Sequence, residues 1–271
     1  MDSKIVLEMA PTKENPRNSE GDFIKLKDGR IMYAYSKFVG GCADWSTTEI
    51  AAVFSNDNGD HWSDPKVFFK TSDFENCENI MSVSLMRMND GAVGMFFLIR
   101  RNSFDMRLHL FRSYDEGETW SEPICCIPRK GYFVTNNNRV IRTSTGRLIF
   151  PGNYLFIRDE SNPYSFSFHE TCHYFYSDDD GETWQESPNF SSMPFSCSIS
   201  GLEETGLIEL RPGLIMAYSR TDLCMQFATY SHDDGISWTP VEPLRFFTSA
   251  VSPMKIQRLT DNRLISFWNP T

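Results

Sequence analysis

Acidic and arginine side chains are the residues of this sequence best suited to chemistry on a charged ligand. Glu204 and Arg220 stand on the two sides of one predicted hairpin, and Arg17, Glu20 and Asp44 stand around an earlier one. An arginine binds a carboxylate through two parallel hydrogen bonds, and an aspartic or glutamic acid can move a proton at a reacting oxygen. These residue types predict a site for an anionic ligand, provided that the fold brings them together.

A repeated hairpin is the element that must position them. It reads as an apolar strand, a turn with Gly or Asn, and a second apolar strand, in five copies: Phe23–Met32, Val83–Val93, Val140–Ile149, Leu207–Met216 and Met254–Ile265. Asp-Gly and similar pairs favour such turns. At one common spacing before the turn stand Glu20, Ser82, Asn137, Glu204 and Pro253, and at one common spacing after it stand Ser36, Leu98, Asn153, Arg220 and Asn269.

A second repeat lies between the hairpins. The pattern S-x-D-x-G-x-x-W occurs four times, at Ser55–Trp62, Ser113–Trp120, Ser177–Trp184 and Ser231–Trp238. Each copy follows a short apolar run, as expected for a strand that enters a turn. We expect the Asp to accept hydrogen bonds from the turn, the Gly to adopt a positive φ, and the Trp to begin the return strand and bury its ring between sheets. The acids are too few and wrongly spaced for a calcium loop.

The two repeats together predict an all-β chain with four antiparallel strands per unit. Four-stranded units in radial repetition form a β-propeller. We expect a single propeller domain over 1–271, with blades at roughly 20–65, 79–125, 136–188 and 202–243 and a partial fifth blade at 252–271. Residues 154–171 read as a rim loop. Because the sequence ends after the first hairpin of the fifth blade, we expect a C-terminally truncated piece of a longer protein, or an oligomer or partner that covers the open edge.

The same frame predicts where the polar residues meet. In a propeller, the first strand of each blade lines the central channel, so equivalent positions of different blades converge at one end of the axis. These positions and their neighbours include Glu20, Asn137, Glu204, Arg220 and Asn269, with Arg17, Asp44, Arg100, Asn138 and Arg139 beside them. An ionisable cluster at such a mouth is typical of a ligand site. The alternative is a set of solvated strand ends or salt bridges between blades.

The composition and net charge argue against some classes of binding partner. The 271 residues carry a net charge of −10, which argues against nucleic acid but not against a small anion held by local arginines. Neither a signal peptide nor a membrane span is evident, and the seven cysteines show no metal-ligand spacing. We expect a cytoplasmic protein, unless a signal has been removed, with no membrane partner, no metal and no cofactor.

The four octapeptides on four-stranded units resemble the Asp-box (BNR) repeats of the sialidase superfamily, whose propellers have six blades. This resemblance implies an exo-glycosidase that hydrolyses terminal sialic acid or a related acidic sugar from glycans. Arg17 resembles the first arginine of the family, Asp44 the acid/base, Glu204 the glutamate that activates a tyrosine nucleophile, and Arg220 the second arginine. The same reading gives substrate-binding roles to Arg17, Glu20, Asn138, Arg139, Arg220 and Asn269.

The sequence also departs from that pattern. The third arginine and the tyrosine nucleophile would lie beyond Thr271, so 1–271 alone is expected to be inactive. Glu20 is an additional acid, and Asn136–Arg139 resembles the broader BNR glycosidase branch. Two alternatives stay open: a non-catalytic glycan-binding propeller, and a different sugar chemistry, such as a lyase, that uses Glu20, Arg139 or His169. A histidine role for His173 is less favoured than packing within its strand.

Overall fold

A computed structural model describes residues 4–159, 161–162 and 165–271, and the chain divides into two compact units. Residues 1–102 and 108–124 form the first unit, and residues 103–107 and 125–271 form the second. The described residues form antiparallel sheets with one short 3-10 turn at Thr71–Asp73 and no α-helix, which confirms the all-β prediction. No helix of the described part is long and apolar enough to span a membrane.

The predicted order of four antiparallel strands is found at the start of the chain. Strands β1 (Arg17–Lys25), β2 (Ile31–Phe38), β3 (Thr48–Ser55) and β4 (Lys66–Lys70) pair in sequence order. The next strands are β5 (Asn79–Arg87), β6 (Val93–Asn102) and β7 (Asp105–Ser113), again in order, and the short β8 (Ile124–Cys125) pairs with β7. Met32 and Ile50 from the first group pack with Val83 and Phe97 from the second in one buried core of the first unit.

The third repeat departs from the predicted pattern because its first strand is broken. The hairpin expected over Val140–Ile149 has only β10 (Ile141–Arg142) before its turn, and the short β9 (Tyr132–Val134) also pairs with β11 (Leu148–Leu155). The polar run Thr135–Arg139 separates β9 from β10, and Asn138 within it has a φ of 52°. Asparagine tolerates this left-handed conformation, which a regular strand cannot contain.

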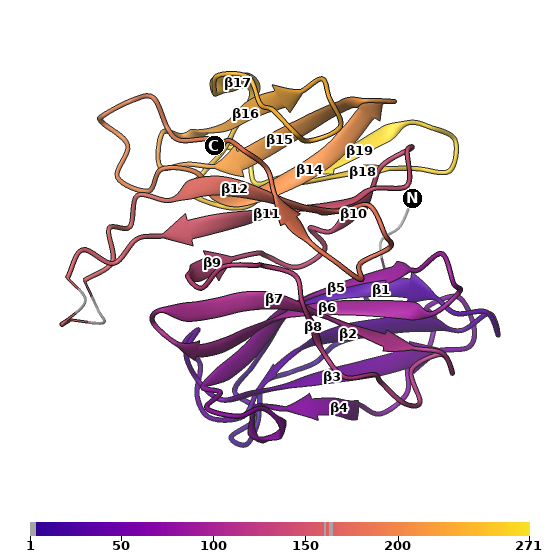
Figure 1. The fold of residues 1–271 in the computed structure, drawn as a ribbon. Helices are drawn as coiled ribbons and strands as arrows, with labels where there is room; N and C mark the ends of the chain where they lie inside the picture. Colours follow the sequence, from indigo (N-terminus) through magenta and orange to yellow (C-terminus); the bar gives the residue numbers. More distant parts are fainter. Residues whose placement is uncertain (1–3, 160, 163–164) are drawn as a thin grey trace. The chain divides into compact units, whose positions relative to one another are not determined.

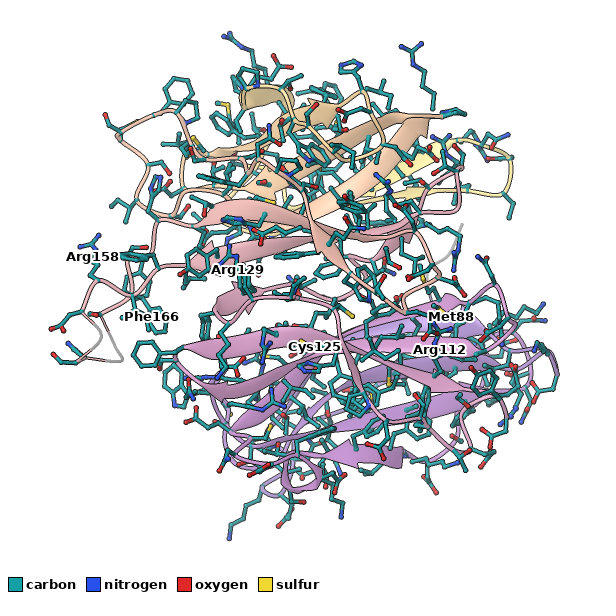
Figure 2. The ribbon with its side chains drawn as sticks, viewed as in Figure 1. Met88, Arg112, Cys125, Arg129, Arg158 and Phe166 are labelled. Carbon is teal, nitrogen blue, oxygen red and sulfur yellow. The ribbon has the colours of Figure 1, made fainter. Side chains whose placement is uncertain are left out.

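The remaining strands of the third repeat frame the polar insertion. Strands β12 (Thr171–Ser177) and β13 (Gln185–Glu186) complete the order β11-β12-β13. Figure 2 labels Arg158 and Phe166 in the loop that joins β11 to β12. A bridge between Ile157 and Phe166 closes this loop into a small hairpin, whose residues 160, 163 and 164 lie outside the described part.

The last strands repeat the first pattern. Strands β14 (Glu203–Arg211), β15 (Leu214–Arg220), β16 (Met225–Ser231) and β17 (Glu242–Thr248) form a four-stranded sheet in sequence order, drawn in orange shades in Figure 1. Strands β18 (Lys255–Arg258) and β19 (Leu264–Phe267), drawn in yellow, form the fifth hairpin. In the second unit, buried Ile149, Tyr174, Leu207 and Ile215 belong to one core cluster.

All four octapeptides form the same hydrogen-bonded turn. The Ser Oγ accepts from the Gly N–H at 2.7–2.8 Å, and the Asp Oδ1 accepts from the backbone N–H four residues later at 2.8–2.9 Å. The glycines have φ values of 89–96° as expected. The residue before each glycine is also left-handed, with φ near 58–60° at Asn58, Glu116, Asp180 and Asp234, which the sequence pattern did not indicate.

Two of the four octapeptide tryptophans, Trp120 and Trp238, contact rings of the preceding group of strands, whereas Trp62 and Trp184 contact Phe23 and Phe150 of their own groups. Trp120 lies 5.4 Å from the ring of Phe68, and Trp238 stacks on Tyr174 with ring centres 3.7 Å apart. The prediction that each ring is buried between sheets is confirmed for Trp238, while Trp120 is half-buried. The prediction that Trp begins the return strand was wrong by at least one residue. The return strand begins directly after Trp184, at Gln185, and four residues after Trp238, at Glu242.

Candidate functional site

A β-bulge recurs in the first strand of three repeats. The register shifts between Ser19 and Asp22 in β1, between Met81 and Ser84 in β5, and between Glu203 and Gly206 in β14. The bulges contain the left-handed residues Glu20, Ser82 and Glu204, with φ values of 57°, 67° and 45°. Bulges re-aim side chains and are common beside active sites, and left-handed non-glycine residues occur where the surrounding structure holds them.

The second strand of one repeat holds the bulge of the next. The Ser36 Oγ accepts from the Ser82 N–H at 3.0 Å. In the same way, the Asn153 Oδ1 accepts from the Thr205 N–H at 3.0 Å, and the Asn153 Nδ2 donates to the Leu202 carbonyl at 2.5 Å. Ser36 and Asn153 are two of the five positions that the hairpin frame made equivalent, and both are buried. The frame predicted the positions, but the hydrogen bonds between repeats appear only in the structure.

Arg220 and two glutamates form the charged cluster of the second unit. The Arg220 Nη1 donates to the Glu204 Oε2 at 2.8 Å, and the Arg220 Nε lies 3.3 Å from the Glu203 Oε2. Burial raises the pKa of Glu203, although the charge of Arg220 opposes that shift. The structure therefore brings Glu204 and Arg220 into direct contact and adds Glu203 to them. In this arrangement the guanidinium can bind an anion, and the two carboxyl groups can accept or donate a proton.

Glu170 is a fourth member of this cluster that the sequence did not reveal. Its side chain is buried, and burial raises its pKa well above the usual range because it disfavours the charged form. The charges of Glu203 and Glu204 raise this pKa further, and the charge of Arg220 lowers it. A parallel bridge to Gly201 places it beside the start of β14. No signal pointed to it, because it follows a polar insertion and owes its burial to this bridge between distant segments.

Arg17, Glu20 and Asp44 form the corresponding cluster of the first unit. The Arg17 Nη1 donates to the Asp44 Oδ1 at 2.5 Å and to the Cys42 carbonyl at 3.0 Å, and its guanidinium lies 4.3 Å from the Phe38 ring centre. The Arg17 Nη2 is 3.8 Å from the Glu20 Oε1. The Asp44 side chain is 70% exposed on the loop between β2 and β3. A ligand anion at Arg17 would exchange with Asp44 or share the guanidinium with it.

Two of the three other predicted binding residues contact the segment that carries β18. The Asn138 carbonyl accepts from the Lys255 Nζ at 2.6 Å, and the buried Arg139 donates from Nη2 to the Met254 carbonyl at 3.0 Å. These two bonds tie the broken strand of the third repeat to the β18–β19 hairpin. Asn269 is exposed after β19. Their roles in ligand binding stay predictions.

His173 belongs to a packed ionic cluster, as the alternative interpretation of this residue expected. Its Nδ1 lies 2.8 Å from the Glu186 Oε1, and its ring stacks on Phe190. Arg129, labelled in Figure 2, donates from Nε to the Glu186 Oε2 at 2.8 Å. Burial would raise the pKa of Glu186, but hydrogen bonds from His173 and Arg129 outweigh it and lower that pKa to about 2. His169 is half-buried just before Glu170.

No group of three or more His, Cys, Asp or Glu residues in the described part of the chain has the geometry of a metal site. The seven cysteines are free thiols. The chemistry available from the described residues is therefore the binding of anions by arginine and the transfer of protons by carboxyl groups.

Comparison with known proteins gives one family and a set of similar structures. The family model for the BNR repeat-like domain matches residues 84–271. No curated protein sequence matches the chain. A Dyadobacter fermentans protein of unknown function superposes with a TM-score of 0.73 at 18% identity, covering 94% of this chain and 76% of that one.

Two of the similar structures are named as sialidases. The intramolecular trans-sialidase of Ruminococcus gnavus has a TM-score of 0.69 at 14% identity, with 93% of this chain and 76% of that chain covered. The NanB sialidase of Streptococcus pneumoniae has a TM-score of 0.68 at 15% identity, with 96% of this chain covered but only 57% of the sialidase. Identities this low show a common fold, here that of the sialidase superfamily. Because the family model spans most of the sequence, the chain belongs to the BNR repeat-like domain family.

Proposed function

We propose that this chain carries a glycoside hydrolase site of the sialidase type, which acts on terminal sialic acid or a related acidic sugar. The carrying observation is the ion pair of Glu204 with Arg220 at 2.8 Å, on a bulge that holds Glu204 in a left-handed conformation. A strained acid paired with an arginine is suited to a site that must place a proton acceptor beside a bound anion. The sialidases among the similar structures support the substrate class.

Each residue has a defined task in this proposal. Arg220 binds the sugar carboxylate, for which a guanidinium supplies two parallel donors. Glu204 accepts the proton of the nucleophile, which is a tyrosine in sialidases. We propose no residue of this chain as that nucleophile. In the first unit, the resemblance to sialidases assigns carboxylate binding to Arg17 and the acid/base role to Asp44.

The remaining predicted residues complete the proposal. Glu20, Asn138, Arg139 and Asn269 keep the substrate-binding roles that the sequence predicts for them. The single propeller domain predicted over 1–271 is part of the same proposal. The substrate is a glycan rather than a nucleic acid, in keeping with the net charge of −10.

The test is turnover of fluorogenic aryl glycosides by the purified protein, in the longest form that its natural reading frame encodes. A sialoside, a glucuronide and a neutral galactoside should be compared. We expect release from the sialoside or another acidic glycoside, with loss of about 10²–10³-fold in kcat/KM for Arg220→Met. Asp64→Asn, on an exposed loop residue, is the matched control. A folded protein that releases no acidic sugar contradicts the proposal.

A second candidate, a glycan-binding protein without turnover, is favoured by one observation. Arg17 and Asp44 form an ion pair with each other at 2.5 Å, so a substrate can bind either side chain only after the pair rearranges. Asp44→Ala separates the two functions. A binding protein should keep or improve its affinity for sialyllactose, whereas an enzyme should retain binding and lose turnover.

A further inference from the structure

The main chain around Glu170 is held on both sides. The Glu170 N–H donates to the Ser200 carbonyl at 2.9 Å, and the Glu170 carbonyl accepts from the Leu202 N–H at 3.0 Å. Gly201 lies between these two partners with a φ of 69°, and a Cβ there would come within 2.4 Å of the Glu170 carbonyl oxygen. The contact requires glycine, and it leaves Glu170 little freedom to move away from the start of β14.

The Glu170 side chain is buried without a hydrogen bond to one of its oxygens. The residue is only 8% exposed, and its Oε2 is buried and has no hydrogen-bond partner among the described residues. A buried ionised carboxylate without partners is strongly disfavoured, whereas a protonated one retains a donor that a ligand can use. An oriented carboxyl group with an unused oxygen is therefore different from an ordinary member of an acidic surface.

The charges around Glu170 do not provide a counterion for it. Arg220 is the cation of this cluster, and its Nη1 is bonded to Glu204 while its Nε faces Glu203 at 3.3 Å. One guanidinium thus faces three carboxyl groups, and the two glutamates of β14 both act electrostatically on Glu170. Like charges placed around one cation favour a proton on one of them, and Glu170, the most buried of the three, is the residue at which the charged form is most disfavoured.

We propose that Glu170 is held in the folded protein as a neutral carboxylic acid and that its O–H group is a hydrogen-bond donor for the ligand anion bound at Arg220. A neutral acid supplies a donor without adding a negative charge that would repel the anion. It thereby selects a ligand that presents an acceptor oxygen beside its carboxylate contact. The identity of that ligand as an acidic sugar rests on the proposed function, whereas the protonation of Glu170 does not.

The first experiment tests protonation without any ligand. A carboxyl group with a raised pKa contributes stability below its unfolded value of 4.5 and loses it as the pH rises through its folded pKa. We expect the stability of wild type relative to Glu170→Gln, measured by urea denaturation, to fall as the pH rises above about 4.5, because Gln is always neutral. Glu242→Gln, at an exposed position, should give a flat difference. A flat difference for Glu170→Gln as well would overturn the proposal.

The second experiment tests the donor. N-Acetylneuraminic acid and acetate are titrated into the full chain, with binding followed by NMR. We expect Glu170→Gln, which keeps a neutral N–H donor, to bind within about threefold of wild type, and Glu170→Met to bind about 10- to 100-fold more weakly. Equal affinities of the two variants for a probe that wild type binds would overturn the donor role.

The two probes also separate this inference from the proposed function. Binding of acetate without binding of the sugar would contradict the acidic-sugar substrate and leave the variants to decide the donor role with acetate. Binding of neither probe to wild type would overturn both the donor role and the anion site at Arg220. The pH dependence of stability would still decide whether Glu170 is neutral.

Discussion

The octapeptide turns and the first-strand bulges both repeat along the chain, but the turns keep their side chains from copy to copy and the bulges do not. In the turns, both the backbone and the chemistry repeat, since each Ser and Asp makes the same bonds in all four copies. In the bulges, the left-handed backbone repeats but the residue changes, from Glu20 to Ser82 to Glu204. A feature whose side chains never vary serves the fold. A feature whose geometry is kept while its chemistry varies leaves its side chains available for a ligand.

The carboxyl groups of the octapeptide turns and those around the β14 bulge also differ in the direction of their pKa shifts. In the second octapeptide, hydrogen bonds from the Thr119 side chain and backbone lower the pKa of Asp115 to about 2. Around the bulge of β14, burial instead raises the pKa of both Glu203 and Glu170. The carboxylates of the turns are thus stabilised as anions by local donors. Glu203 and Glu170 are instead shifted toward the protonated form by burial.

The largest expected effect comes from removing a bulge side chain while keeping its backbone. Glu204→Gly accommodates the left-handed φ of 45° and deletes the carboxylate that contacts Arg220. We expect a loss of about 10²–10³-fold in kcat/KM on the responsive glycoside. Stability should change by no more than about 1 kcal/mol, because relief of the left-handed conformation offsets the lost ion pair. Urea denaturation and turnover of the same preparation measure both effects.

Asn58→Gly is the matched variant at an octapeptide. Asn58 is exposed and left-handed with a φ of 59°, and glycine should change neither activity nor stability by more than about 0.5 kcal/mol. If Glu204→Gly behaves like Asn58→Gly in the activity assay, the bulge is as purely structural as the turn and the comparison fails.

A smaller effect, confined to stability, is expected at the turns. Asp233→Ala removes the acceptor for the Ser231 hydroxyl and the Ser237 N–H and loosens the turn that carries Trp238. We expect a loss of about 1–2 kcal/mol in the free energy of unfolding, with kcat/KM unchanged. The stacking of Trp238 on Tyr174 makes tryptophan fluorescence a suitable probe. A drop in activity under conditions where the variant is fully folded would show that the turns are not only structural.

The sequence predicted the fold well because its signals are local. Each octapeptide contains its own acceptor, its own glycine and its own tryptophan, so the turn follows from eight consecutive residues. The hairpin frame likewise located Glu204 and Arg220 on paired strands. The register itself pairs Arg220 with Glu203, and the bulge that follows, which the frame did not predict, leaves Glu204 2.8 Å from Arg220. The broken strand before Ile141 was missed, since the frame treated Asn137 as an ordinary strand position.

The site was predicted less completely because its remaining members depend on distant contacts. Glu170 lies in the cluster through a bridge to Gly201, and Asn153 reaches Thr205 in the next repeat. Such contacts leave no pattern in a single sequence. The pairing of Arg17 with Asp44 follows from the path of the loop between β2 and β3, which residue types and spacing do not specify.

The smallest expected effects are two pH dependences of opposite sign. Asp115 has a lowered pKa, so it contributes stability above its ordinary value of 3.8 and loses it as the pH falls toward about 2. Glu203 has a raised pKa, so its contribution is present below 4.5 and is lost as the pH rises. The stability of wild type relative to Asp115→Asn should therefore shrink toward acid, and that relative to Glu203→Gln should shrink toward alkali. Denaturation midpoints measured from pH 2 to 9 compare the two slopes directly. A carboxylate stabilised as an anion and one shifted toward its protonated form must respond to pH with opposite signs. Slopes of the same sign would therefore contradict the electrostatic distinction between the turns and the bulge.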